Sequence, residues 1–251
     1  MASESSKFQL QVVAEAEWGA AAARMIESEW HRRHSALIGL PTGLTPQPFY
    51  AELRARHANG ELPDAHARFA MIDDYLGAEH LATSSYQWLS REVFQPLGIE
   101  SGRILRIPTD PLRMPGACAE FEGRLLRWGG CDLLFLGLGA NGHVAFNEPG
   151  SEATSRTRVV RLAETTASAN AAYWGGSFAP REAVTMGLGT ILEARAICLL
   201  VRGAAKTDCL RAVLTGPESP ELPASYLRRA RRLIVLADTE AIPNAAEYLH
   251  A

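Results

Sequence analysis

Short apolar segments alternate with helix-like segments along almost the whole chain, and this alternation constrains the fold more than any other feature. Segments typical of buried strands lie at residues 36–40, 68–72, 103–107, 133–136, 196–201 and 233–236. Helix-like segments lie at residues 12–34, 45–56, 86–95, 115–128, 203–214 and 239–249, with a further helix near Glu193. Strands that alternate with helices pair in parallel through crossover connections. The sequence therefore predicts a Rossmann-like α/β fold, with a doubly wound, mostly parallel sheet and helices on both faces.

The length and apolar content favour one domain. A chain of 251 residues that is 47% apolar suits a single α/β domain spanning residues 1–251. Residues 151–182 are its least regular part, with a polar and basic start, a helix-like segment at 165–173 and a break at Gly175-Gly176. Two interpretations are open for this segment: a mobile flap hinged at the glycines, or a plain surface excursion.

Composition excludes several functional classes. No apolar run approaches 18 residues, so no membrane span is expected. Residues 1–6 lack a basic-then-apolar signal pattern, and we expect a cytoplasmic protein. The net charge of −3 argues against nucleic acid as a partner. The four cysteines show no C-x-x-C spacing, so buried free thiols are expected rather than a metal site or a redox pair.

The segment Cys131–Gly150 carries the strongest sign of a catalytic site. An apolar strand ends in Gly137, Gly139 and Gly142, and a glycine such as Gly139 lets the backbone approach a ligand closely. His143 and Glu148 follow, where an open α/β sheet places its ligands. The glycines also fit the dinucleotide fingerprint G-x-G-x-x-G, but no helix pattern follows and no acid lies near residue 159. Nicotinamide binding is therefore not expected.

Two other turns offer groups for an anion. The turn Pro41–Pro46 follows a strand, with Thr45 as the expected N-cap and Pro46 as the expected first residue of a helix. Free amides in such a turn can bind an anion, although an ordinary strand-to-helix turn would look the same. Lys206 also lies at a strand-to-helix turn, where it could reach a phosphate or be merely solvated.

Asp73 and Asp74 follow the second predicted strand directly. Crowded carboxylates repel each other, so we expect a raised pKa for one of them. The alternative is that one carboxylate caps the next turn while the other is solvated.

Four of these segments, in this order, resemble the glucosamine-6-phosphate deaminase family, within a wider group that includes 6-phosphogluconolactonases. The segments are Leu40–Pro46, Ile72–Tyr75, Leu136–Gly150 and Thr185–Leu192. The resemblance covers roughly residues 10 to 240, and the sequence G-H-x-A-F-N-E-P-G at residues 142–150 is its most specific part. It implies that a 2-amino-2-deoxyhexose 6-phosphate, with the gluco or galacto configuration, is converted to the ketose 6-phosphate plus ammonia.

The resemblance also implies roles for individual residues. His143 would move a proton during ring opening, Glu148 would orient its imidazole, and Asp73 would take the proton from C2. Asp74 would support Asp73 beside the substrate. The phosphate would lie on the backbone of Thr42, Gly43, Leu44 and Thr45, with Lys206 as its counter-charge. No metal or organic cofactor is implied. The spacing of His143 and Glu148 could suggest metal ligands, but a third ligand is lacking.

The chain departs from the family pattern at Asn141, where glucosamine-type members usually have aspartate. Either Glu148 alone orients His143, or the proton relay is impaired. Asparagine here, together with residues 223–227, resembles the galactosamine-6-phosphate branch. Arg156-Thr157-Arg158 resembles part of the allosteric site of hexameric members, but Val160 replaces a lysine, so allosteric activation and a hexamer are not expected. The protein could be a monomer or a homo-oligomer.

Two other functions stay open at this stage. A 6-phosphogluconolactonase-like hydrolase would use His143 to activate water and would not need Asp73 as a carbon base. A non-catalytic sugar-phosphate sensor would bind an amino-sugar phosphate without turnover, and Asn141 motivates that alternative.

Overall fold

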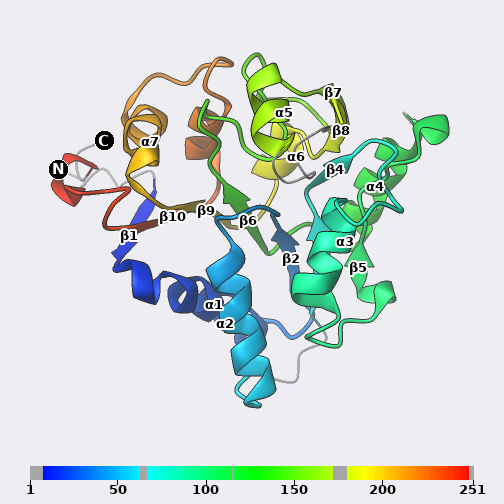
Figure 1. The fold of residues 1–251 in the computed structure, drawn as a ribbon, viewed down its shortest axis with the longest axis horizontal. Helices are drawn as coiled ribbons and strands as arrows, with labels where there is room; N and C mark the ends of the chain where they lie inside the picture. The colour runs from blue at the N-terminus through cyan, green and yellow to red at the C-terminus, as the bar shows by residue number, and fades with distance from the viewer. Residues whose placement is uncertain (1–7, 63–66, 115, 172–179, 249–251) are drawn as a thin grey trace.

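A seven-stranded parallel sheet forms the centre of the molecule (Figure 1). The computed structural model describes residues 8–62, 67–114, 116–171 and 180–248. The strand order is β1-β10-β9-β6-β2-β3-β5, and all neighbouring strands run parallel. The strands are β1 (Gln9–Val13), β2 (Leu37–Leu40), β3 (Arg68–Met71), β5 (Ile104–Leu105), β6 (Leu133–Gly137), β9 (Ile197–Val201) and β10 (Leu233–Asp238). The predicted mostly parallel α/β sheet is confirmed.

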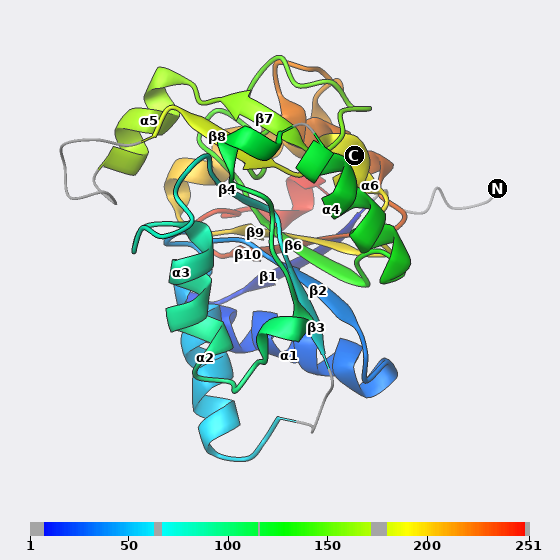
Figure 2. The same ribbon diagram turned by 90° about the vertical axis from the view of Figure 1, so that its right-hand side faces the viewer.

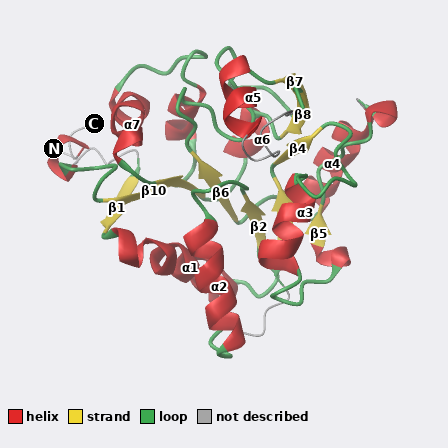
Figure 3. Cartoon of the chain, in the orientation of Figure 1, coloured by secondary structure: helices red, strands yellow, loops and turns green. Residues whose placement is uncertain are grey.

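Helices cover both faces of this sheet, as predicted. Figures 1 and 2 show α1 and α2 on one face, and α6 and α7 on the other. The α-helices, coloured red in Figure 3, are α1 (Glu15–Arg32), α2 (Gln47–Ala58), α3 (Ser85–Leu89), α4 (Gly116–Arg127), α5 (Glu164–Ala171), α6 (Leu188–Leu192) and α7 (Thr207–Thr215). A π-helical turn, Ser90–Phe94, extends α3. Short 3-10 turns lie at Ser101–Arg103, Pro111–Arg113, Ala204–Lys206, Pro223–Arg229 and Ala245–Tyr248. No described helix is long and apolar enough to span a bilayer.

A second, smaller sheet lies beyond the carboxyl ends of the main strands. It is antiparallel, in the order β4-β8-β7, and consists of β4 (Asp73–Tyr75), β8 (Glu182–Thr185) and β7 (Arg158–Arg161). Sequence analysis did not predict this sheet, because strands of three or four residues give too little alternation to detect. The position of this sheet bears on the functional site, because the candidate catalytic residue Asp73 is the first residue of β4.

Close packing joins α1 and α2 to the sheet. The aromatic rings of Phe49 in α2 and Phe135 in β6 are 5.0 Å apart between centroids, and both side chains are fully buried. A Cβ atom at Gly19 would lie 2.7 Å from the carbonyl oxygen of Pro48, so only glycine allows α1 to approach α2 this closely. The predicted free thiols are confirmed: Cys118, Cys131 and Cys198 are buried and unpaired, and Cys209 is unpaired and half-buried.

Three predicted element boundaries were wrong. The segment before residue 14, assigned to a helix from Val12, instead forms the edge strand β1, because its residues alternate in the period of a strand. Thr45 does not cap α2: Pro46 occupies the N-cap position without a side-chain hydrogen bond, and the helix begins at Gln47. The last predicted helix, 239–249, is a turn followed by the short 3-10 turn Ala245–Tyr248 within the described residues.

The predicted flap region contains more regular structure than expected. Residues 158–161 form β7, and the helix predicted at 165–173 is α5 as far as Ala171. Gly175 and Gly176, the proposed hinge, lie outside the described residues. Movement of this region as a flap stays a prediction.

The chain reverses its direction of travel across the sheet between β2 and β6. From β2 it moves outward to β3 and β5, and it then returns to β6 on the other side of β2. In open α/β sheets, ligands bind at the carboxyl ends of the two strands that flank such a switch point. The topology therefore predicts a binding site just beyond Leu40 and Gly137.

Candidate active site

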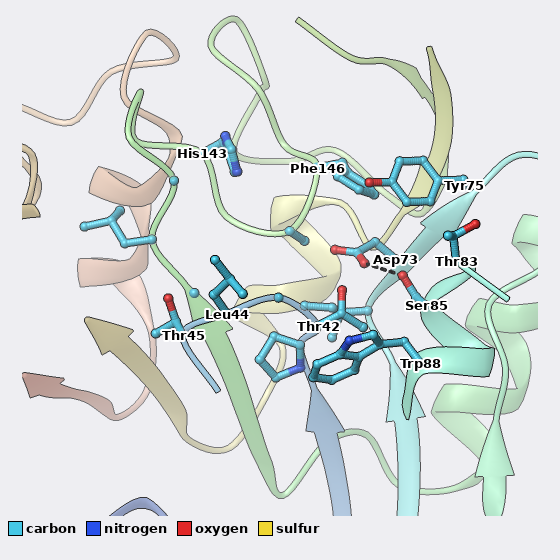
Figure 4. A pocket seen from close by; sticks show the side chains of 17 residues that line it. Thr42, Leu44, Thr45, Asp73, Tyr75, Thr83, Ser85, Trp88, His143 and Phe146 are labelled. Carbon is cyan, nitrogen blue, oxygen red and sulfur yellow. Dashed lines mark hydrogen bonds between the residues drawn. The ribbon is translucent and has the colours of Figure 1, made fainter. Parts of the chain in front are cut away.

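A pocket opens at this switch point (Figure 4). Residues from four segments line it: residues 41–45 after β2, residues 72, 73 and 75 after β3, three residues around the start of α3, and residues 137–139, 143, 145 and 146 after β6. It includes Thr42, Gly43, Leu44, Thr45, Asp73, Gly139 and His143, seven of the residues predicted from the sequence. The structure thus brings together segments that lie far apart in the sequence.

The turn after β2 presents backbone amides to this pocket. Gly43 has a φ of +109°, which disfavours any residue with a Cβ. Among the described residues, the amides of Gly43, Leu44 and Thr45 donate to no backbone carbonyl. Leu44 is 67% exposed. A turn with free amides followed by the start of α2 suits an anionic group of a ligand.

Asp73 is a buried carboxyl group that faces the pocket. The residue is 7% exposed, and its Oδ1 atom accepts a hydrogen bond of 3.5 Å from the Ser85 hydroxyl. Burial, followed by the charge of Asp74, raises the pKa of Asp73 from 3.8 to about 7. The predicted raised pKa is thus found on Asp73. A carboxyl group that titrates near neutral pH is suited to act as a general base.

Asp74 has a different position from the one we expected. Its carboxylate accepts hydrogen bonds from the amides of Tyr75, Ser85 and Tyr86, and so it holds the first turn of α3. It is not among the residues that line the pocket. Burial raises its pKa, although the three amides oppose that change. The alternative that one aspartate caps the next turn therefore fits Asp74, whose charge in turn acts on Asp73.

Asn141 connects His143 to Glu148. The imidazole Nδ1 of His143 lies 2.7 Å from Oδ1 of Asn141, and Nδ2 of Asn141 donates to Oε2 of Glu148 at 2.7 Å. Nδ1 of His143 also lies 3.6 Å from Oε2 of Glu148. Burial opposes ionisation of Glu148, but the polar groups of His143, Thr166 and Asn141 lower its pKa to about 2. Glu148 is therefore ionised at neutral pH.

This ionised carboxylate determines how the Asn141 amide is oriented. An ionised carboxylate only accepts hydrogen bonds, so the NH₂ group of Asn141 must face Glu148. Its oxygen then faces His143, where it accepts from the imidazole Nδ1–H and from the His143 amide at 3.2 Å. In the neutral ring, Nε2 is thus left as an acceptor. Asparagine at position 141 can therefore fix one tautomer of His143, and it links the imidazole to Glu148 by hydrogen bonds.

The backbone of the loop after β6 fits around the imidazole. A Cβ at Gly139 would lie 2.4 Å from the His143 ring, so the ring packs directly on this glycine. Gly142 has a φ of +81°, and its carbonyl accepts from the amide of Ala224 at 2.9 Å. Ala224 belongs to the buried segment 223–227 that we singled out in the sequence. Ala145 has a φ of +50°, which is strained for a residue with a Cβ and is typical of functional loops.

Lys206 does not line the pocket. It lies in the turn before α7, half-buried, and burial lowers its pKa. Its electrostatic neighbour is Cys209, whose Sγ lies 3.7 Å from the carbonyl oxygen of Gly139. A phosphate contact by Lys206 therefore stays a prediction.

Sequence analysis missed part of the pocket lining. Tyr75, Thr83, Ser85, Trp88 and Phe146 also line it, and Figure 4 shows Ser85 beside Asp73 on the side opposite His143. Tyr75 could have been inferred from its place after the aspartates, whereas the contribution of α3 depends on tertiary packing. Within the described ranges, no group of three His, Cys, Asp or Glu side chains could hold a metal ion.

The family model and the related sequences that match this chain point to the same family. The family model described as glucosamine-6-phosphate isomerases/6-phosphogluconolactonase matches residues 11–235. A glucosamine-6-phosphate deaminase of Streptomyces coelicolor is 40% identical over 84% of this chain and 82% of its own length. Glucosamine-6-phosphate deaminase 2 of Bacillus subtilis is 35% identical over 87% of this chain and 90% of its own length.

Comparison with solved structures agrees. A monomeric glucosamine-6-phosphate deaminase superposes with a TM-score of 0.89 at 32% identity, over 94% of this chain and 99% of that one. The 6-phosphogluconolactonase of Trypanosoma brucei superposes with a TM-score of 0.75 at 24% identity, over 96% of this chain and all of the other. At that lower identity the likeness concerns the fold alone.

Proposed function

Because the chain belongs to the family of glucosamine-6-phosphate isomerases and 6-phosphogluconolactonases, we propose that it is a deaminase that converts a 2-amino-2-deoxyhexose 6-phosphate to the ketose 6-phosphate and ammonia. One observation carries this proposal beyond family membership. Asp73, a carboxyl group with a pKa of about 7, lines the same pocket as the His143 imidazole. Deamination by isomerisation needs both a base for a carbon-bound proton and a group that opens the sugar ring.

The substrate phosphate binds to the turn after β2. The amides of Gly43, Leu44 and Thr45 donate to its oxygens, and the Thr42 and Thr45 hydroxyl groups add donors. The exposed Leu44 side chain closes over the bound sugar. A phosphate fixed at this end of the pocket places the other end of the sugar near Asp73 and His143.

His143 opens the pyranose ring. Its Nε2 atom accepts the proton from the hydroxyl group at C1 and returns it to the ring oxygen, as the bond from C1 to that oxygen breaks. The His143 imidazole carries a positive charge between the two proton transfers. Ionised Glu148, 3.6 Å from Nδ1, stabilises that charge, and Asn141 keeps the imidazole in the tautomer that can accept at Nε2.

Asp73 then acts on the open-chain aldehyde. Its ionised carboxylate takes the proton from C2, and the electron pair forms a double bond between C1 and C2 while the carbonyl oxygen takes up a proton from solvent. The Asp73 carboxyl group then returns its proton to C1, which gives a protonated imine at C2. Addition of water to the imine and loss of ammonia leave the ketose 6-phosphate, so one water is consumed for each ammonia released.

The choice between gluco and galacto substrates depends on C4. The names of the relatives support glucosamine 6-phosphate, whereas Asn141 and residues 223–227 support a test of galactosamine 6-phosphate. Both sugars share the atoms on which Asp73 and His143 act.

The experiment follows ammonia release from each amino-sugar phosphate and acid release from 6-phosphogluconolactone, with wild type and Asp73→Asn. The proposal predicts ammonia release from at least one sugar that is lost in the variant. Lactone hydrolysis that survives Asp73→Asn, without ammonia release, would identify a lactonase instead. Tight binding of an amino-sugar phosphate with no turnover would identify a sensor.

A further inference from the structure

The small sheet places one row of polar side chains beneath the active-site loop. In the register of β4, β8 and β7, Asp73 is opposite Thr185, and Thr185 is opposite Arg158. Residues directly opposite each other in antiparallel strands project from the same face of the sheet. The proposed base is therefore the first member of a row that continues through Thr185 to Arg158.

The loop that carries His143 and Glu148 is attached to the other two members of this row. The Thr185 hydroxyl accepts the amide of Phe146 at 3.1 Å and donates to the carbonyl of Met186 at 3.2 Å. Thr185 is fully buried. Among the described residues, the Phe146 amide donates to no backbone carbonyl, so the Thr185 hydroxyl is the acceptor that holds it.

Arg158 holds the loop through Asn147. Its guanidinium donates to Oδ1 of Asn147 at 3.0 Å and to the Ser151 hydroxyl at 3.2 Å. Asn147 is fully buried and donates in turn to the carbonyls of Val144 and Met186 at 3.1 and 2.8 Å. The guanidinium of Arg158 thus provides the donor for Oδ1 of Asn147, the residue that directly precedes Glu148 in the sequence.

We propose that Thr185 and Arg158 are positioning residues that set the distance between Asp73 and the His143–Asn141–Glu148 relay. The loop contains the strained residue Ala145, with a φ of +50°, and such a conformation persists only where its surroundings hold it. Asp73 belongs to the sheet, and the loop is docked on the same sheet, so one rigid element orients both parts of the catalytic machinery. This inference rests on the proposed deaminase function.

The test replaces each contact while preserving side-chain size. Thr185→Val removes the hydroxyl group, and Thr185→Ser restores it. Arg158→Met removes the guanidinium. Two controls match these changes outside the row: Thr190, which is buried and bonded to Glu122, is changed to Val, and Arg156, which pairs with Glu193 and Glu122 at the surface, is changed to Met.

We expect kcat for ammonia release to fall about 10- to 100-fold in Thr185→Val and Arg158→Met, with KM changed less than threefold, because a misplacement of about 1 Å costs this much in rate. Thr185→Ser and both controls should stay within about threefold of wild type. In the controls, a fall in kcat accompanied by an equally large rise in KM would overturn the proposal. Failure of Thr185→Ser to restore kcat would also overturn it.

Hydrogen exchange of residues 143–150, measured by mass spectrometry on the folded proteins, needs no turnover. Exchange should accelerate in Thr185→Val and Arg158→Met but not in the controls. If wild type releases no ammonia, the proposed function fails, and this exchange pattern still shows whether the row holds the loop. Unchanged exchange, or faster exchange with unchanged kcat, would refute the positioning role.

Discussion

Replacing Asp73 with asparagine is expected to stabilise the folded protein at neutral pH while it abolishes activity. A carboxyl group whose pKa is higher in the folded chain than in the unfolded chain binds more protons when folded, so its contribution to stability falls as the pH rises between the two values. For Asp73 these values are about 7 and 3.8. The difference corresponds to about 4 kcal/mol of destabilisation, which is complete above pH 7 and absent below pH 3.8.

Urea denaturation of wild type and Asp73→Asn at pH 5 and pH 8 measures this effect. The free energy of unfolding gained by the variant should be larger at pH 8 than at pH 5, by about 3 kcal/mol. Asp208→Asn is the matched control, because the Asp208 side chain is 97% exposed, and its effect should be equal at both pH values. An equal gain for Asp73→Asn at the two pH values would refute the claim that the fold disfavours the ionised carboxylate.

Three further predictions test the pocket. First, kcat/KM should fall to about one-tenth of its plateau at pH 6, because Asp73 must be ionised and its pKa is about 7; a plateau that extends to pH 5 would exclude Asp73 as the base. Second, Ala145→Gly should raise the free energy of unfolding by about 1 kcal/mol, because it relieves a φ of +50°, and should lower kcat, because it loosens the loop; thermal melts and kinetics check both effects, and a destabilised variant would contradict the strain. Third, Lys206→Ala should raise KM about 10-fold with kcat within about threefold, as steady-state kinetics would show, if its half-buried ammonium reaches the phosphate; an unchanged KM would remove Lys206 from the site.

The parts of the fold that depend on local patterns were predictable from the sequence. The strands β2, β6 and β9 are continuous apolar runs, and β3 and β10 are apolar except for Arg68 at the start of one and Asp238 at the end of the other. Buried parallel strands are typically of this kind. The edge strand β1 was hidden because its alternating residues directly precede an alanine-rich helix. The small sheet depends on contacts between distant segments, such as Asp73 with Thr185, and no local pattern reports such contacts.

In the candidate site, too, some features were predictable from the sequence and others depended on tertiary packing. The turn after β2, Asp73 and His143 were predicted from their places after strands, and they line one pocket. The role of Asp74 could not be chosen from the sequence, because the amides of α3 that hold it come from a helix whose packing only the fold determines. Likewise, the sequence left open whether Asn141 impairs the proton relay or whether Glu148 alone orients His143. The position of Asn141 between His143 and Glu148 shows that an amide can link the two.

The most direct test of the account is the stoichiometry of turnover by the purified wild-type protein in the presence of a metal chelator. Glucosamine 6-phosphate and galactosamine 6-phosphate are each supplied, and ammonia and ketose 6-phosphate are measured together. The account predicts one ammonia for each ketose 6-phosphate from at least one of the sugars, and none from either with Asp73→Asn. No ammonia from either sugar, or turnover that persists in Asp73→Asn, would contradict it.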